Sequence, residues 1–134
     1  MIVVICVDDK NGIGFNRRRQ SRDRLLIADL VEYSQGRKIL ISGYSATLFS
    51  GFEVNTEIGE NLLDEAGEDD ICFLENVDPA PYADRISGLV IYRWNRHYPS
   101  DKWLSLDTTA FRTVSVKEFE GSSHECITRE EMTR

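Results

Sequence analysis

The sequence is short of several residue types, and each shortage removes a class of protein. Its 134 residues include three cysteines, three prolines and two histidines. The cysteines are odd in number and form no C-x-x-C pair, so we expect buried reduced thiols rather than a disulfide framework. No run of about 18 apolar residues occurs, and no basic segment leads into an apolar run at the start, so the sequence indicates neither a membrane span nor a signal peptide. We expect a cytoplasmic protein with no membrane partner and one domain over residues 1–134.

Basic residues are missing from a long central stretch, so the two signs of charge are separated along the chain. The formal net charge is −7, from 16 basic and 23 acidic residues, and no lysine or arginine lies between Lys38 and Arg85. Five arginines crowd into eight positions: Arg17, Arg18, Arg19, Arg22 and Arg24. An acidic protein repels duplex nucleic acid, so we expect no such partner beyond the arginine cluster itself. Guanidinium groups there would favour a phosphate or a carboxylate, unless neighbouring acids such as Asp8, Asp9 or Asp23 neutralise them.

The hydrophobic pattern predicts strands that alternate with helices. Residues 2–7 form an apolar run rich in valine and isoleucine, which is typical of a strand buried on both faces. Ser21 as an N-cap and Gly36 as a stop predict a helix over 22–35. The other expected elements are strands at 38–42, 71–74, 86–94, 111–116 and 125–132 and helical turns at 45–49 and 61–66. This order predicts an α/β fold with a mostly parallel sheet and an antiparallel C-terminal hairpin.

Segments at both ends of the chain follow an order and spacing that are typical of one family. At the front they are Met1 to Val7, Asn11-Gly12-Ile13-Gly14, Ala28-Asp29-Leu30 and Lys38 to Gly43. Toward the end they are Ala83 to Ile86, Tyr92 to Asp101, Phe111 to Val114 and Ser123 to Cys126. Together these segments resemble those of dihydrofolate reductases, and the resemblance implies a shortened, three-layer dihydrofolate reductase-like α/β fold. It also implies an enzyme that reduces dihydrofolate with a nicotinamide cofactor and holds the pterin with a carboxylate on its first helix.

The resemblance places a candidate site at the carboxyl ends of the parallel strands, where open α/β sheets bind their ligands. Asp29 matches the catalytic carboxylate of the family, although Asp23 competes for that role. The residues that would converge on a ligand are Gly12, Gly14, Asn16, Arg18, Arg19, Ser42, Gly43 and Tyr92.

Several departures from the family concern cofactor binding. The family has Gly-Arg after its second strand, whereas Gly43 is followed here by Tyr44. The segment with which the family binds the adenine half of the cofactor has no counterpart after Phe49. Where the family has paired glycines that approach the pyrophosphate, this chain has Glu75-Asn76, and a carboxylate there repels phosphate. We therefore expect no cofactor, and NADPH in particular is doubtful.

The sequence thus predicts a divergent dihydrofolate reductase-like protein that lacks standard reductase activity and binds a small anionic ligand of nucleotide or pterin type. Any catalysis that persists would be that of an oxidoreductase of this family. A non-catalytic interaction protein, such as a homodimer built on the edge hairpin, is the main alternative.

An RNA-processing nuclease is a less favoured alternative, suggested by a resemblance to chains with a similar Arg-Arg-Gln-Ser-Arg-Asp-Arg segment, which sometimes carry a ribonuclease Z label. That family binds two zinc ions with a His-x-His-x-Asp-His cluster. The two histidines here, His97 and His124, belong to no such cluster, so we expect no metal site. His124 has no evident Ser-His-Asp partners and is assigned a structural role.

Overall fold

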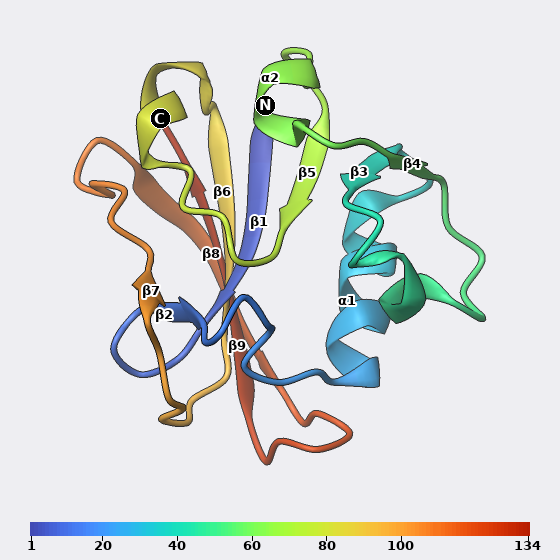
Figure 1. Cartoon of the computed structure of the whole chain (residues 1–134), viewed down its shortest axis with the longest axis vertical. Helices are drawn as coiled ribbons and strands as arrows, with labels where there is room; N and C mark the ends of the chain where they lie inside the picture. Colours follow the sequence, from blue (N-terminus) through green and yellow to red (C-terminus); the bar gives the residue numbers. More distant parts are fainter.

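A seven-stranded mixed sheet runs through the centre of the computed structural model, which describes residues 1–134 (Figure 1). Its strands, in spatial order, are β4 (Thr56–Ile58), β3 (Ile39–Ile41), β5 (Ile71–Leu74), β1 (Ile2–Val7), β6 (Gly88–Arg93), β9 (Ile127–Thr133) and β8 (Arg112–Phe119). The strands from β4 to β6 are parallel, and β9 and β8 complete the sheet antiparallel. The expected order is confirmed, since the strands predicted at 2–7, 38–42, 71–74 and 86–94 lie in this one sheet.

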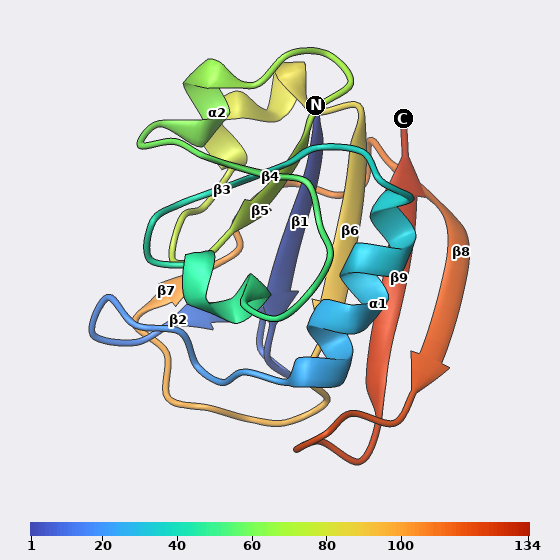
Figure 2. The ribbon, with the colours of Figure 1, turned by 90° about the vertical axis from the view of Figure 1, so that its right-hand side faces the viewer.

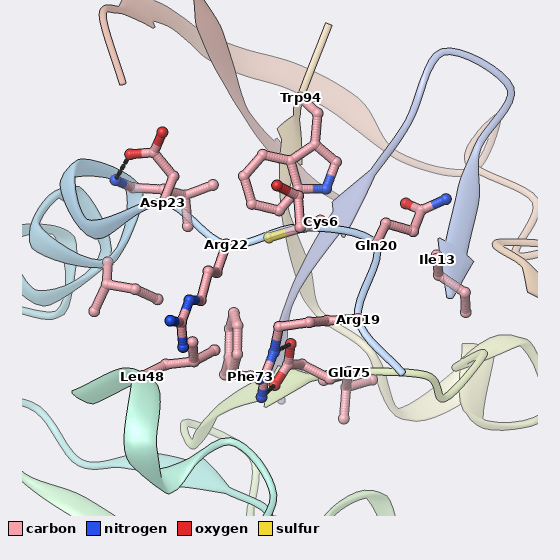
Figure 3. A pocket seen from close by; sticks show the side chains of 14 residues that line it. Cys6, Ile13, Arg19, Gln20, Arg22, Asp23, Leu48, Phe73, Glu75 and Trp94 are labelled. Carbon is pink, nitrogen blue, oxygen red and sulfur yellow. Dashed lines mark hydrogen bonds and ion pairs between the residues drawn. The ribbon is translucent and has the colours of Figure 1, made fainter. Parts of the chain in front are cut away.

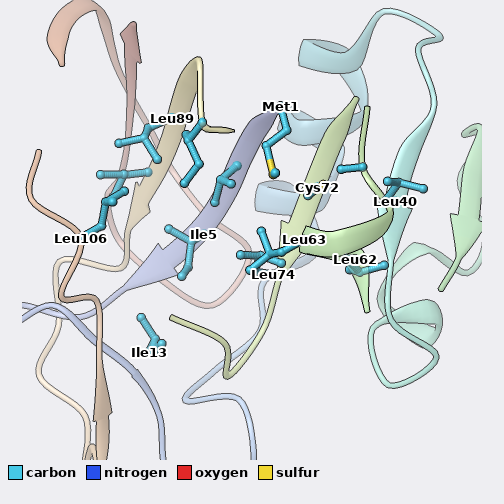
Figure 4. Packing of buried hydrophobic residues seen from close by; sticks show 14 of the residues in the cluster. Met1, Ile5, Ile13, Leu40, Leu62, Leu63, Cys72, Leu74, Leu89 and Leu106 are labelled. Carbon is cyan, nitrogen blue, oxygen red and sulfur yellow. The ribbon is translucent and has the colours of Figure 1, made fainter. Parts of the chain in front are cut away.

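β1 is central because its apolar side chains are buried on both faces of the sheet. Val4 lies between Phe73 of β5 and Val90 of β6 in the register, and Val3 and Val4 are both fully buried. On one face, Met1 and Ile5 pack in a cluster with Leu62 and Leu63 of a short helix, as Figure 4 shows. The other face packs against a longer helix. Helices therefore cover both faces of the sheet in three layers.

The helix on that second face is α1 (Arg24–Ser34), shorter at its start than the predicted 22–35. Its N-cap is Asp23 rather than Ser21, because the Asp23 carboxylate accepts hydrogen bonds from the backbone N–H groups of Leu25 and Leu26. At the other end Gln35 takes the left-handed conformation with φ 49°, and Gly36 continues it with φ 81°. This backbone stops the helix near the expected residue.

The remaining elements are short. They are the helices η1 (Ala46–Phe49), α2 (Leu62–Glu65) and η2 (Ala80–Arg85) and the strands β2 (Gly12–Gly14) and β7 (Lys102–Trp103). η1 and α2 confirm the predicted turns, whereas β2, β7 and β4 were not predicted, since two or three residues carry no periodic signal. β2 and β7 pair into a separate small sheet. No helix is long and apolar enough to cross a membrane.

Candidate functional site

A small cavity lies where the carboxyl ends of β1, β5 and β6 meet α1 and the loop before it (Figure 3). β1 contributes Cys6, α1 contributes Leu26 and Ile27, and the ends of the other two strands bring Phe73 and Trp94. Its volume is about 20 Å³, which is room for about one water molecule. The walls are largely apolar, so the site favours an apolar or aromatic group over a fully polar one.

An ion pair closes one side of this cavity. Arg19 donates from Nε to Oε2 of Glu75 over 2.8 Å and from Nη2 to Oε1 over 2.9 Å, and both residues line the cavity. Ser45 also donates to Oε1 of Glu75, and the guanidinium lies 4.1 Å from the centre of the Tyr44 ring. Glu75 is mostly buried. The Glu75 carboxylate, which would repel a phosphate, is therefore neutralised by Arg19.

An open, polar hollow of about 400 Å³ adjoins the cavity and shares Arg22, Asp23 and Leu48 with it. Arg24, Thr47, Ser122 and Ser123 complete its lining. Arg22 and Arg24 are exposed, and neither has a carboxylate within ion-pair distance. Arg24 instead donates to the Ser50 carbonyl and lies over the Phe52 ring. The only acid in the hollow, Asp23, is buried and turned toward other partners.

Those partners donate hydrogen bonds to both carboxylate oxygens of Asp23. The backbone N–H groups of Ser122 and Ser123 each donate to it over 2.8 Å, and Nδ1 of His124 lies 2.9 Å from Oδ2. Burial opposes ionisation, but these hydrogen bonds outweigh it and hold the pKa of Asp23 well below its usual value. Because a carboxylate only accepts, Nδ1 of His124 carries a proton here.

His124 is part of a buried chain of hydrogen bonds. Its Nε2 lies 2.7 Å from the Tyr98 hydroxyl, and its ring stacks on Trp94 with centroids 4.5 Å apart. When His124 is neutral, Nδ1 donates to Asp23 and Nε2 accepts from Tyr98, so every member is satisfied. The chain ties the β8–β9 connection to the start of α1, which is the structural role expected for His124.

Asp29, the predicted catalytic carboxylate, lies outside the cavity lining. It faces the C-terminal hairpin, where Lys117 Nζ donates over 2.6 Å and Arg129 Nη1 over 2.7 Å. The Tyr92 hydroxyl donates to the same carboxylate over 2.7 Å. Burial opposes ionisation of Asp29, yet these donors lower its pKa below the usual value. Its charge is thus fully engaged within the protein.

The other predicted site residues are gathered only in part. Asn16, Arg18 and Arg19 line one open hollow near Tyr98, and Arg19 also lines the cavity. Ser42 lines a third depression beside α2, Gly43 is exposed and Tyr92 is fully buried. Gly12 and Gly14 serve packing, since a Cβ on Gly12 would meet Ser100 at 2.0 Å and one on Gly14 would meet Asn76 at 1.7 Å.

Four residues that line the cavity were not predicted from the sequence as site residues. Leu26 and Ile27 are the side chains that α1 presents to the cavity, and helical periodicity marks Leu26 as core without revealing a cavity. Gln20 also lines it, and its buried Oε1 has no hydrogen-bond partner. Trp94 forms part of the same wall and stacks on His124. No group of three or more His, Cys, Asp or Glu side chains could hold a metal ion.

Comparison with known proteins identifies the architecture. No family model and no curated protein matches the sequence. Among solved structures, a dihydrofolate reductase from Enterococcus faecalis, complexed with NADP(H) and RAB-propyl, superposes with a TM-score of 0.69 and 8% sequence identity. The match covers 99% of this chain and 95% of that one. The fold is that of a dihydrofolate reductase.

The residues of this dihydrofolate reductase fold do not fit the phosphates of a nicotinamide cofactor. At the carboxyl end of β5, the Glu75 carboxylate takes up the donors of Arg19 and Ser45. The adjacent space above Gly14 is filled by the Asn76 side chain. Tyr44 follows Gly43 and offers a ring to Arg19 instead of a cation to a phosphate. A pyrophosphate bound through bare amides needs this space and these donors free.

Proposed function

We propose that this protein is a divergent dihydrofolate reductase-like protein that binds a small anionic ligand of nucleotide or pterin type and does not carry out standard dihydrofolate reduction. The observation that carries the proposal is the pair Arg22 and Arg24, which flank a hollow of about 400 Å³ without a carboxylate partner. That hollow adjoins an apolar cavity. A ligand with one ring and one anionic group matches this combination of walls.

The absence of standard reduction is supported by what α1 presents to the cavity. Its contribution is apolar, from Leu26 and Ile27, and its carboxylate at Asp29 is bound by Lys117 and Arg129 on another side. A general acid must come within hydrogen-bond reach of the atom that it protonates. Asp29 would have to break two ion pairs to do so.

The charge of the hollow supports an anion as the ligand. Arg22 precedes α1 and Arg24 is its first residue, so both cations stand at the positive end of the helix dipole. This arrangement is unfavourable in the empty protein. A phosphate or carboxylate would relieve it, because guanidinium groups bind these anions bidentately.

The ring of the ligand needs more space than the cavity now offers. A volume of about 20 Å³ holds no heterocycle. We infer that the loop carrying Arg19 and Gln20 opens to admit the ring, because each of its bonds to the facing wall involves a side chain, from Arg19 to Glu75 and Tyr44 and from Gln20 to Ser100. Once the ring has entered, the free Oε1 of Gln20 would accept an N–H of the heterocycle.

Isothermal titration calorimetry tests the proposal with three named probes: adenosine monophosphate, pteroate and inorganic phosphate. We expect at least one ring-containing anion to bind more tightly than phosphate alone. The charge reversals Arg22→Glu and Arg24→Glu should weaken that binding about tenfold or more, and raising the salt concentration should weaken it further.

Arg17→Glu is the matched control, because Arg17 carries the same charge, is exposed and lines neither the cavity nor the hollow. It should leave affinity nearly unchanged. If all three reversals weakened binding equally, the arginine cluster as a whole would attract the anion, which would contradict a site at Arg22 and Arg24. Oxidation of NADPH by the wild-type protein in the presence of dihydrofolate would contradict the absence of reductase activity.

A further inference from the structure

The side-chain amide of Gln20 presents an acceptor to the cavity, and no group of the protein donates to it. Gln20 lines the cavity, and its Oε1 atom is buried without a hydrogen-bond partner. In Figure 3 this oxygen points toward Trp94, and the amide nitrogen points away from it. A buried carbonyl oxygen that accepts nothing is unfavourable, so a donor from outside the chain would stabilise it.

The amide nitrogen of Gln20 is held on the other side by Ser100. Nε2 donates to the Ser100 hydroxyl oxygen over 2.6 Å. Two acceptors face the single hydroxyl proton of Ser100 at 3.3 Å, namely Oδ2 of Asp8 and the carbonyl oxygen of Tyr98. Neither acceptor has a proton to give, so Ser100 donates to one of them and accepts from Gln20. This network decides which end of the amide faces the cavity.

Asp8 is ionised and therefore keeps the network in one direction. Its Oδ1 accepts from the backbone N–H groups of Lys10 and Gly12 over 2.9 and 2.7 Å, and its Oδ2 accepts from the N–H of Tyr98 over 3.1 Å. Burial opposes ionisation, but the hydrogen bonds outweigh it and hold the pKa of Asp8 below its usual value. At neutral pH this carboxylate is only an acceptor.

The network joins three segments that the fold brings together. Asp8 follows β1, Gln20 lies in the loop after β2, and Ser100 lies just before β7. β2 and β7 pair near the end of β1, as Figure 2 shows. Gly12 in β2 leaves the room that the two side chains need, because a Cβ there would come within 2.8 Å of Gln20 Nε2 and closer still to Ser100 Oγ. The orientation of Gln20 is therefore built into the fold.

We propose that Gln20 determines the specificity of this site, and that it selects ligands whose ring carries an N–H donor at the edge that enters the cavity. Once the loop has closed over the ring, a heterocycle without this donor would leave Oε1 unpaired. A heterocycle with an acceptor there would place two lone pairs against each other. This role of Gln20 rests on the proposed function, and it adds the chemistry by which the cavity distinguishes one heterocycle from another.

Isothermal titration calorimetry with a matched pair of nucleotides tests this role. Adenosine monophosphate carries an exocyclic amino group, and purine riboside monophosphate has the same ring system, ribose and phosphate without that group. The wild-type protein should bind adenosine monophosphate about tenfold more tightly or better. Gln20→Met keeps the length of the side chain and removes the amide, so it should reduce this preference to about twofold or less. The same variant should weaken the binding of pteroate.

Ser100→Ala tests the network itself, because it removes the acceptor that holds Nε2 and lets the amide turn over. The preference for adenosine monophosphate should fall in this variant although Gln20 is still present. Ser115→Ala is the matched control, since Ser115 lies on β8 and lines neither the cavity nor the hollow. It should retain the wild-type preference. Circular dichroism checks that each variant is folded.

Equal affinities for the two nucleotides in the wild type would overturn the role of Gln20 and leave the proposed function intact. So would a preference that persists in Gln20→Met or that Ser100→Ala leaves unchanged. If pteroate were the only ring-containing probe to bind, an unchanged affinity in Gln20→Met would overturn the role in the same way. Failure of every ring-containing anion to bind would overturn the proposed function, and the role of Gln20 with it.

Discussion

The Arg19 guanidinium and the Glu75 carboxylate form a two-pronged ion pair, with N–O distances of 2.8 and 2.9 Å, that joins the loop after β2 to the end of β5. Both side chains are largely withdrawn from solvent. Both side chains line the cavity that Cys6 and Phe73 also line, so we expect the pair to hold the loop over these two residues.

We predict that Arg19→Gln makes Cys6, which is partly exposed with the ion pair in place, more accessible to thiol reagents. Loss of a charged hydrogen-bonded pair favours opening by about tenfold or more. Burial, and then the charge of Glu75, raise the pKa of Cys6 well above its usual value, so the wild-type thiol should react slowly. The measurement is the rate of alkylation at each cysteine, located by mass spectrometry.

Cys126 is the internal reference, because it lies outside the cavity lining. Glu75 keeps its charge in Arg19→Gln, so a faster reaction of Cys6 would report exposure of the thiol, with the fall in pKa that loss of burial brings, and not removal of the Glu75 charge. An unchanged rate at Cys6 would show that the ion pair does not control entry.

Asp29 should prove essential for stability. Asp29→Asn removes the carboxylate but leaves Arg129 mostly buried beside it, and breaking such a pair costs about 3 kcal/mol of unfolding free energy. Lys117 contributes less, since its side chain is 43% exposed. Urea unfolding measures the loss.

Tyr92→Phe is the comparison for Asp29, because it removes one hydrogen bond to the carboxylate and leaves both cations in place. It should cost about 1 kcal/mol. If Asp29→Asn kept full stability but abolished ligand binding, the catalytic role first assigned to Asp29 would have to be restored.

The protein should lose stability as the pH falls below about 4. The pKa of Asp23 is lower in the folded chain than its unfolded value of about 3.9. A carboxyl with a depressed folded pKa stabilises the fold above the unfolded pKa, and this contribution disappears as the pH falls toward the folded pKa. The pKa values of Asp8 and Asp29 are lowered too, and they act in the same direction.

Asp23→Asn should therefore flatten the dependence of unfolding free energy on pH between about 4 and 2. Chemical unfolding at several pH values measures this slope. Exposed Asp9→Asn is the control and should retain the wild-type slope. A slope in Asp23→Asn equal to that of the wild type would show that Asp23 is not depressed by Ser122, Ser123 and His124.

We predict that NADPH binds only weakly, because Glu75, Asn76 and Tyr44 stand at the positions where the resemblance implies phosphate contacts. A micromolar dissociation constant needs about −8 kcal/mol, which the remaining groups cannot supply. Calorimetric titration that gave a micromolar or tighter constant would contradict this expectation. Glu75→Gly, which removes the carboxylate and opens the backbone, is the variant expected to gain affinity.

The sequence predicted the order of the main strands because each is a short apolar run between turn residues. Ile2 to Val7 is an example, since burial on both faces requires an apolar side chain at nearly every position. Two- and three-residue strands such as β2 and β7 could not be predicted, because their pairing depends on residues far apart: Gly12 faces Trp103 across the small sheet.

The candidate site was predicted less well, for a reason that Asp29 illustrates. Asp29 is buried on α1 together with Leu26 and Leu30. Its partners Lys117 and Arg129, however, come from a hairpin about a hundred residues away along the chain. Local sequence contains no signal for such contacts.

The sequence by itself thus determined the α/β class, the central strands, the helix that ends near Gly36 and the concentration of arginines before that helix. These follow from local hydrophobicity, turn chemistry and charge, which need no knowledge of distant neighbours. Only the tertiary structure decided that Glu75 neutralises Arg19, that Asp23 rather than Ser21 caps α1, and that Arg22 and Arg24 remain without a carboxylate partner. Charges and hydrogen bonds act over a few ångströms, so their partners are known only once the sheet has brought distant segments together.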